Sequence, residues 1–235
     1  MKKTNKRFIA ALVVGLSLVA AACGSSDDAA EETPAAAGGE LEGMKGTMPL
    51  VALSDEFKTG MNEFWVAAGN AELTDFSYAA EAFDSVMLVA LAAEAAKTDG
   101  SALAGEIMNV SRDGETCTEF AACVELIKAG TDINFEGVSG PQDMNGNGEP
   151  IKASYGVLTF DATNRFDYAD AEYILADLPE SDYVDLQAPT VERAGDGVLK
   201  FGTLLPETGN LAFLGPPEFA GVEYAISLIN AAGGV

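Results

Sequence analysis

The stretch VLKFGTLLPETGNLAFLGPPEFAGVEYAISLINAAGG, residues 198–234, decides the fold class of this chain. Its first part, Val198–Leu205, is mostly apolar and predicts a buried strand that ends at Pro206. The pair Pro216–Pro217 predicts the first turn of a helix, because proline needs no hydrogen-bonded N–H there. The apolar face of this helix is expected to comprise Phe219, Val222, Ile226 and Ile229. A strand, a loop and a helix in this order begin a βαβ unit, so we expect an α/β fold.

Upstream of this stretch, the strongest helix signal is TDFSYAAEAFDSVMLVALAAEAAK, residues 74–97, with Ser77 as the expected cap. Its part from Val86 to Ala93 is apolar on all sides, which predicts deep burial but is far too short to span a bilayer. Further helices are predicted by apolar spacing and caps. They cover residues 55–68 (capped by Ser54), 102–110 and 118–128, and residues 41–53 are expected to be extended.

A turn at residues 145–148 (NGNG) lies between two stretches with strand character, 138–144 and 151–160, and predicts a hairpin. Asp143, with the asparagines and glycine that follow it, also matches the first half of a calcium-binding loop. The twelfth position of such a loop would be Ser154, where a bidentate Glu is required. The hairpin turn is therefore favoured over a calcium site.

The composition excludes several function classes. The chain has 235 residues, 37 Asp and Glu against 13 Lys and Arg, and no His. The net charge of −24 argues against nucleic-acid binding, because phosphates need a basic face. Without His, no Ser-His or Cys-His catalytic set and no His-ligated zinc site can form. Carboxylate pairs such as Glu31–Glu32 and Asp182/Asp185 are uninformative in so acidic a chain. We expect no catalytic residue, cofactor or metal.

The N-terminus has the pattern of an export signal. Four basic residues, Lys2, Lys3, Lys6 and Arg7, precede the uncharged run 8–22, and the sequence continues as Cys23-Gly-Ser-Ser. Small residues before this single Cys resemble a bacterial lipoprotein cleavage site. The resemblance implies that residues 1–22 are removed and that Cys23 is lipidated. This interpretation is favoured over two alternatives, secretion without a lipid and an uncleaved membrane anchor. Residues 23–40, acidic and without large apolar side chains, are expected to be a disordered tether.

Cys117 and Cys123 remain after Cys23 is set aside. In an oxidising compartment a local disulfide is the favoured state of this pair, over a reactive or metal-binding pair of thiols. Residues 166–196 are acidic, with scattered Tyr and Pro, and are predicted to be a linker that holds one short helix at most.

The C-terminal part of the chain resembles the mature N-terminus of type I periplasmic-binding proteins of the branched-chain amino acid kind. These proteins are substrate-binding lipoproteins of ABC importers. The stretches that carry this resemblance are Val198–Gly215, Glu218–Ile226 and Ile229–Gly234. Residues 41–165 resemble the other end of the same family. The stretches that carry this second resemblance are Glu42–Thr47, Thr74–Tyr78, Ala82–Val86 and Val138–Pro141 with the following hairpin.

The resemblance implies a two-lobed α/β clamp, a Venus flytrap, of which this chain holds a fragment. Residues 41–165 correspond to the family's C-terminal portion, and residues 197–235 correspond to its N-terminal βα unit. Their order is swapped, and the long middle of the family is absent. A clamp of this kind binds a small solute in its cleft and closes over it.

By the same resemblance, the loop after the first strand brings Thr208 and Gly209 to the cleft. Phe213 and Leu214 fall near the position where relatives place an aromatic ring, and Tyr78 lines the opposite lobe. The resemblance also places Phe83 on that lobe, but core packing is the favoured interpretation of this residue. The implied partners are an amino-acid-like solute, an ABC permease and the membrane, which the protein reaches through its lipid anchor outside the cytoplasm.

A second hypothesis is a truncated surface lipoprotein that acts as an interaction module without a ligand. The lone βα unit would leave a sheet edge open, so self-association is also expected.

Overall fold

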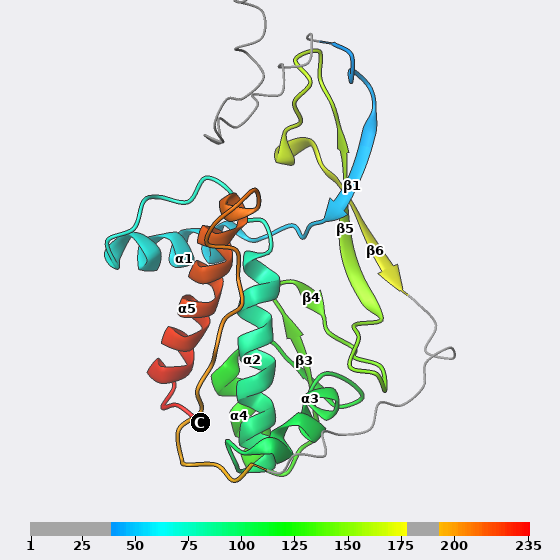
Figure 1. Ribbon diagram of the computed structural model, residues 1–235. Coiled ribbons are helices and arrows are strands. Elements are labelled where there is room, and N and C mark those ends of the chain that lie inside the picture. Colours follow the sequence, from blue (N-terminus) through cyan, green and yellow to red (C-terminus); the bar gives the residue numbers. More distant parts are fainter. Residues whose placement is uncertain (1–38, 178–192) are drawn as a thin grey trace, which may run out of the picture. The chain divides into compact units, whose positions relative to one another are not determined.

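Helix α2 (Ala79–Ala96) is the central element of the protein in the computed structural model, which describes residues 39–177 and 193–235 (Figure 1). It is buried along most of its length, as its apolar sequence predicts. The cap differs from the prediction. Tyr78, in the left-handed region at φ 61°, is the N-cap residue, and the Ser77 hydroxyl donates instead to Asp75.

Helix α5 (Gly215–Ala231) lies along α2 in Figure 1, so segments far apart in sequence share one core. Ala220, Ala225 and Ile229 are buried in this contact. The two helices approach so closely that a Cβ at Gly221 would collide with the Ala79 carbonyl oxygen. The predicted helix after Pro216–Pro217 is therefore confirmed.

Helix α1 (Asp55–Ala67) adds an aromatic layer to the core. The Ser54 hydroxyl accepts the Phe57 N–H at 3.1 Å, so the predicted cap is confirmed. The helix buries Phe57, Met61 and Trp65. The ring of Phe57 lies edge-on to Phe83 with centroids 5.1 Å apart, and Phe83 is a core residue as expected.

A small mixed sheet packs beside α2. Its strands are β2 (Glu115–Cys117), β3 (Ile133–Gly137) and β4 (Gly140–Pro141). Strands β2 and β3 are parallel, with α4 (Phe120–Lys128) between them in the chain, and β4 is antiparallel to β3. The region predicted as one helix over 102–110 is a 3-10 turn, η1 (Ser101–Gly105), followed by the single-turn helix α3 (Glu106–Asn109). The Cys117–Cys123 disulfide is present, with Cα atoms 5.5 Å apart.

Asp84 joins α2 to the loop after β3. Its carboxylate accepts the backbone N–H groups of Val138 and Ser139 at 3.0 and 2.7 Å, and the side chain of Gln142 also donates to it. The residue is only 1% exposed. Burial, partly offset by these hydrogen bonds, raises the pKa of Asp84 to about 6.

The second sheet consists of β1 (Lys45–Pro49), β5 (Lys152–Thr159) and β6 (Glu172–Asp177) in the order β1-β5-β6. Both pairings are antiparallel. The expected hairpin over 138–160 forms only at its tip, where Met144 and Pro150 make an isolated bridge, because β5 pairs with β1 and β6 instead. At this tip the Asn145 side-chain oxygen accepts two backbone N–H groups, and Asp143 pairs with Lys152.

Within the predicted linker 166–196, the described residues 166–177 hold more than the one short helix expected there. Residues 168–170 form the 3-10 turn η2 (Tyr168–Asp170), and β6 follows as an ordered strand. The hydrogen-bonding partner of β6 is β5, and this long-range pairing leaves no signal in the local composition. Residues 178–192 lie outside the described part of the chain.

The predicted buried strand 198–205 is wrong. The segment belongs to no sheet, and Val198 and Leu204 are exposed, Leu204 completely so at 102%. Leu199, Phe201 and Leu205 still pack against the core. A strand needs a neighbouring strand for its backbone hydrogen bonds, and no strand in the described residues pairs with this segment. The α/β class is confirmed, although the sheets are small. No helix in residues 39–177 and 193–235 is both long enough and apolar enough to cross a membrane.

Candidate functional site

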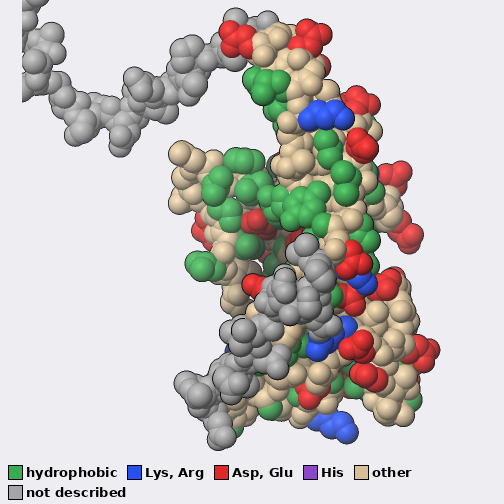
Figure 2. Space-filling view, turned by 90° about the vertical axis from the view of Figure 1, so that its right-hand side faces the viewer, with side chains coloured by type: hydrophobic (Ala, Val, Ile, Leu, Met, Phe, Trp, Pro, Cys, Tyr) green, Lys and Arg blue, Asp and Glu red, His purple; other side chains and the backbone are tan. Residues whose placement is uncertain are grey.

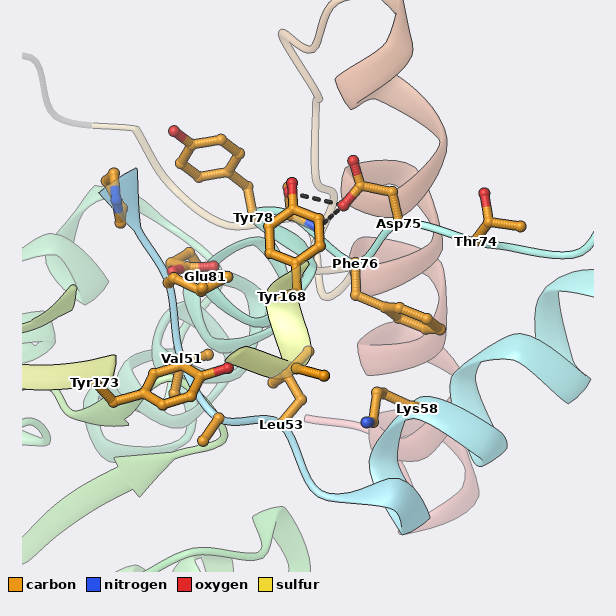
Figure 3. Close-up of a pocket in the computed structure, with 15 residues that line it drawn as sticks. Val51, Leu53, Lys58, Thr74, Asp75, Phe76, Tyr78, Glu81, Tyr168 and Tyr173 are labelled. Carbon is orange, nitrogen blue, oxygen red and sulfur yellow. Dashed lines mark hydrogen bonds between the residues drawn. The ribbon is translucent and has the colours of Figure 1, made fainter. Parts of the chain in front are cut away.

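A cavity of about 390 Å³ opens where three parts of the chain meet (Figure 3). The parts are the β1–α1 connection, the turn that begins α2, and the η2–β6 region. Its lining comprises Pro49, Leu50, Val51, Ala52, Leu53, Lys58, Thr74, Asp75, Phe76, Ser77, Tyr78, Glu81, Tyr168, Ala169 and Tyr173. Cavities of this size hold small organic ligands.

The apolar wall of the cavity is the β1–α1 connection, residues 49–53. Leu50 fixes this wall to the sheet, because its side chain fills the space where Gly156 of β5 has no side chain. The Leu50 N–H also donates to the Ser154 carbonyl oxygen at 3.2 Å. An apolar wall of this kind suits the hydrocarbon part of a solute.

The polar wall begins at the turn before α2. One Asp75 carboxylate oxygen accepts both the N–H and the hydroxyl of Ser77, at 2.9 and 2.7 Å (Figure 3). This local pattern favours a turn over an earlier start of the helix. It fixes the backbone immediately before Tyr78, whose left-handed conformation then redirects the chain into α2.

The charged groups of the cavity differ in how they are compensated. Lys58 forms an ion pair with Asp55 at 2.9 Å, one helical turn earlier. Glu81 is half-buried in the first turn of α2, and desolvation raises the pKa of its carboxyl group. Among the described residues, Glu81 forms no ion pair. Three tyrosines, Tyr78, Tyr168 and Tyr173, line the same cavity.

A second cavity of about 410 Å³ lies among α1, α2, α4 and α5. Its walls include the core rings of Phe57, Phe83 and Tyr224, which pack on one another. The first cavity is the stronger candidate, because it includes Tyr78, which the sequence predicts for the cleft, whereas the rings that line the second pack on one another in the core.

The residues that the sequence predicts for the cleft are only partly brought together. Tyr78 lines the first cavity. Thr208 and Gly209 lie in the exposed loop before the 3-10 turn η4 (Ala212–Leu214). Within that turn Phe213 is 63% exposed and Leu214 is half-buried. These four are not among the residues lining the first cavity, and their role stays a prediction.

Three lining residues, Glu81, Tyr168 and Tyr173, are not among those that the sequence predicts for the cleft. Glu81 lies near the start of the strongest predicted helix, but no feature of the neighbouring sequence indicates that it lines a cavity. The tyrosines lie in the stretch interpreted as a linker, and only the β5–β6 pairing places them. The predicted lipidation site, Cys23, lies outside the described residues. Within the described residues, no group of three or more metal-ligand side chains is found.

One comparison with known proteins covers most of the residues that line this cavity. A family model described as "Receptor family ligand binding region" matches residues 27–163, more than half of the chain. The match includes β1, α1, α2 and β5, and it ends before β6 and α5. Searches of curated proteins and of solved structures returned no match.

Proposed function

The chain belongs to the receptor family of ligand-binding regions, and from this membership we propose that it is an extracytoplasmic solute-binding lipoprotein of an ABC importer. The observation that carries the proposal is the 390 Å³ cavity, whose lining lies mostly within the matched residues. The mixed α/β architecture agrees with a partial type I periplasmic-binding-protein fold, and a ligand-binding role follows from the family.

The proposed ligands are branched-chain or related amino acids, or their amides. The resemblance of residues 41–165 and 198–234 to importer receptors supports this class, and the apolar wall of residues 49–53 suits a branched hydrocarbon side chain. Binding would favour the conformation in which the sheet β1-β5-β6 closes on the start of α2, because a ligand shifts the population toward the state it contacts best.

The membrane side of the proposal rests on the N-terminal sequence. Removal of residues 1–22 and acylation of Cys23 would attach a strongly acidic protein to the membrane by lipid alone, since its charge opposes contact with anionic lipid. The permease would be its partner. Mass spectrometry of the purified protein tests this part: a diacylglyceryl mass on Cys23 is expected, and an intact leader would contradict it.

Ligand binding is tested by calorimetric titration of the full chain with a panel of amino acids, amino-acid amides and amines. The matched variants are Ala52→Trp, which fills the cavity from an exposed wall position, and Ala122→Trp, which adds the same ring to an exposed position of α4. Saturable binding is expected in the wild type and Ala122→Trp, and its loss in Ala52→Trp. Absence of binding across the panel would refute the proposal.

A second candidate function is an interaction module, and one observation favours it. Strand β6 is an edge strand, with Ile174 and Leu175 exposed at 49% and 56%. Figure 2 shows hydrophobic side chains gathered on the face of the molecule that carries this strand, with acidic side chains around them. Light scattering of the wild type and of Ile174→Lys distinguishes the two functions: a dimer lost in the variant supports association, and a monomer in both argues against it.

A further inference from the structure

The charges that line the first cavity do not balance. Lys58, Asp75 and Glu81 are its charged lining residues, so the lining carries one excess negative charge. The ammonium group of Lys58 is bound by Asp55, and Asp75 is bound by the N–H and hydroxyl of Ser77. Neither Asp75 nor Glu81 has an opposite charge among the described residues. Asp75 is held by Ser77, whereas the side chain of Glu81 receives no hydrogen bond from another described residue, so Glu81 is the carboxylate left for a ligand.

Glu81 remains a strong acceptor despite its burial. It lies in the first turn of α2, where the positive end of the helix dipole favours a carboxylate. The described residues place no cation against it. A half-buried carboxylate of this kind gains most from a ligand that brings a positive charge, because both charges are screened less than in bulk water.

Aromatic residues line the same cavity as Glu81. Tyr168 from η2, Tyr173 from β6 and Phe76 from the turn before α2 line the cavity that Glu81 also lines (Figure 3). The face of an aromatic ring attracts an ammonium group electrostatically, and more strongly when water is excluded. No unpaired cation is present among the lining residues to receive a carboxylate of the ligand.

We propose that this cavity selects cationic organic solutes, namely an ammonium group on an apolar body without a carboxylate beside it. The ammonium group lies against Glu81 and the rings of Tyr168 and Tyr173, and the apolar body lies against Val51 and Leu53. This inference rests on the proposed solute-binding function and narrows its ligand class: an amine or an amide of an amino acid binds more tightly than the zwitterionic amino acid.

The test compares three solutes with one hydrocarbon skeleton in calorimetric titrations of the full chain at pH 7. The solutes are 3-methylbutylamine (cationic), leucine (the same skeleton with a carboxylate) and 3-methylbutanol (neutral). The amine is expected to bind at least roughly tenfold more tightly than either of the others, the scale of one partly screened charge interaction. Equal or tighter binding of leucine would overturn the inference.

Variants assign the preference to named groups. Glu81→Gln keeps the shape and is expected to remove the advantage of the amine while leaving 3-methylbutanol within twofold. Tyr173→Leu is expected to weaken amine binding roughly two- to fivefold, as loss of one cation–π contact predicts. The control Glu223→Gln changes a carboxylate at an exposed position of α5 and is expected to have no effect. Circular dichroism and the melting temperature check that each variant folds.

The outcomes separate this inference from the proposed function. If leucine, the alcohol or another panel solute binds and Ala52→Trp abolishes that binding while the amine shows no preference, solute binding stands and cation selection fails. If the amine keeps its advantage in Glu81→Gln, the assignment to Glu81 fails. If no solute of the series or the panel binds, both fail.

Discussion

The buried carboxyl group of Asp84 gives a quantitative prediction for the pH dependence of stability. The pKa of this group rises from 3.8 to about 6 on folding, chiefly because burial disfavours its charged form. The folded state therefore binds this proton more tightly than the unfolded state. The stabilising contribution is complete below pH 3.8, falls as the pH rises through 6, and is absent above it.

The magnitude follows from the size of the shift. Each unit of pKa corresponds to about 1.4 kcal/mol, so the difference between 3.8 and about 6 corresponds to about 3 kcal/mol. Asp84 is 1% exposed, so screening by solvent does not reduce this figure appreciably. Glu81 shifts in the same direction and several exposed aspartates shift in the opposite one, so the contribution of Asp84 has to be isolated by comparison with a variant.

Urea unfolding at pH 4 to 7.5, followed by the fluorescence of the single tryptophan, Trp65, measures this contribution in the wild type and in Asp84→Asn. The difference in unfolding free energy between the two proteins is expected to decrease by about 2 kcal/mol from pH 4 to pH 7. This is less than the full value of about 3 kcal/mol, because the unfolded carboxyl group is already more than half ionised at pH 4. The variant is expected to be less stable at every pH, because an amide offers one acceptor oxygen where the carboxylate receives the Val138, Ser139 and Gln142 donors. A difference that stays constant or grows with pH would refute the reasoning.

Three further predictions concern the elements around the site. Gly221→Val is expected to destabilise the protein by at least 1–3 kcal/mol, the usual cost of overpacking, because a Cβ there collides with the Ala79 carbonyl oxygen. The same substitution at the exposed Gly202, where a Cβ would meet no atom within 4 Å, should leave the melting temperature higher than Gly221→Val does. Ser54→Ala is expected to cost about 1 kcal/mol through loss of the α1 cap, with solute affinity unchanged in calorimetry. Reduction of the Cys117–Cys123 disulfide, or its replacement by two serines, is expected to cost less than ~3 kcal/mol in chemical unfolding, because the closed loop is short. A larger loss would show that the bridge does more than close this loop.

The sequence predicts the helical part of the fold well, because the helices carry their signals locally. Ser54 caps α1, and Pro216–Pro217 lie in the first turn of α5. Residues 86–93 are apolar on all sides, and all of them except Val89 are buried. The disulfide could also be predicted, since five residues separate the two cysteines and local closure is easy.

The sheets could not be predicted with the same success, because pairing is a long-range property. The composition of residues 172–177 suggested a linker, and only β5 makes them a strand. Residues 198–205 have the apolar content of a buried strand but find no partner strand in the described structure. The candidate site could be predicted only in part for the same reason, because some of its residues are placed by strand pairing. Tyr78 was identified from the resemblance, whereas Tyr168 and Tyr173 reach the cavity through the β5–β6 pairing.

The most direct test of the central claim is a crystal structure of the protein with the solute from the panel that binds most tightly. The solute is expected to occupy the cavity between residues 49–53 and the start of α2. Its ammonium group is expected to lie within hydrogen-bonding distance of Glu81 and against the rings of Tyr168 and Tyr173. A solute bound elsewhere, or one whose carboxylate lies beside Glu81, would contradict this claim.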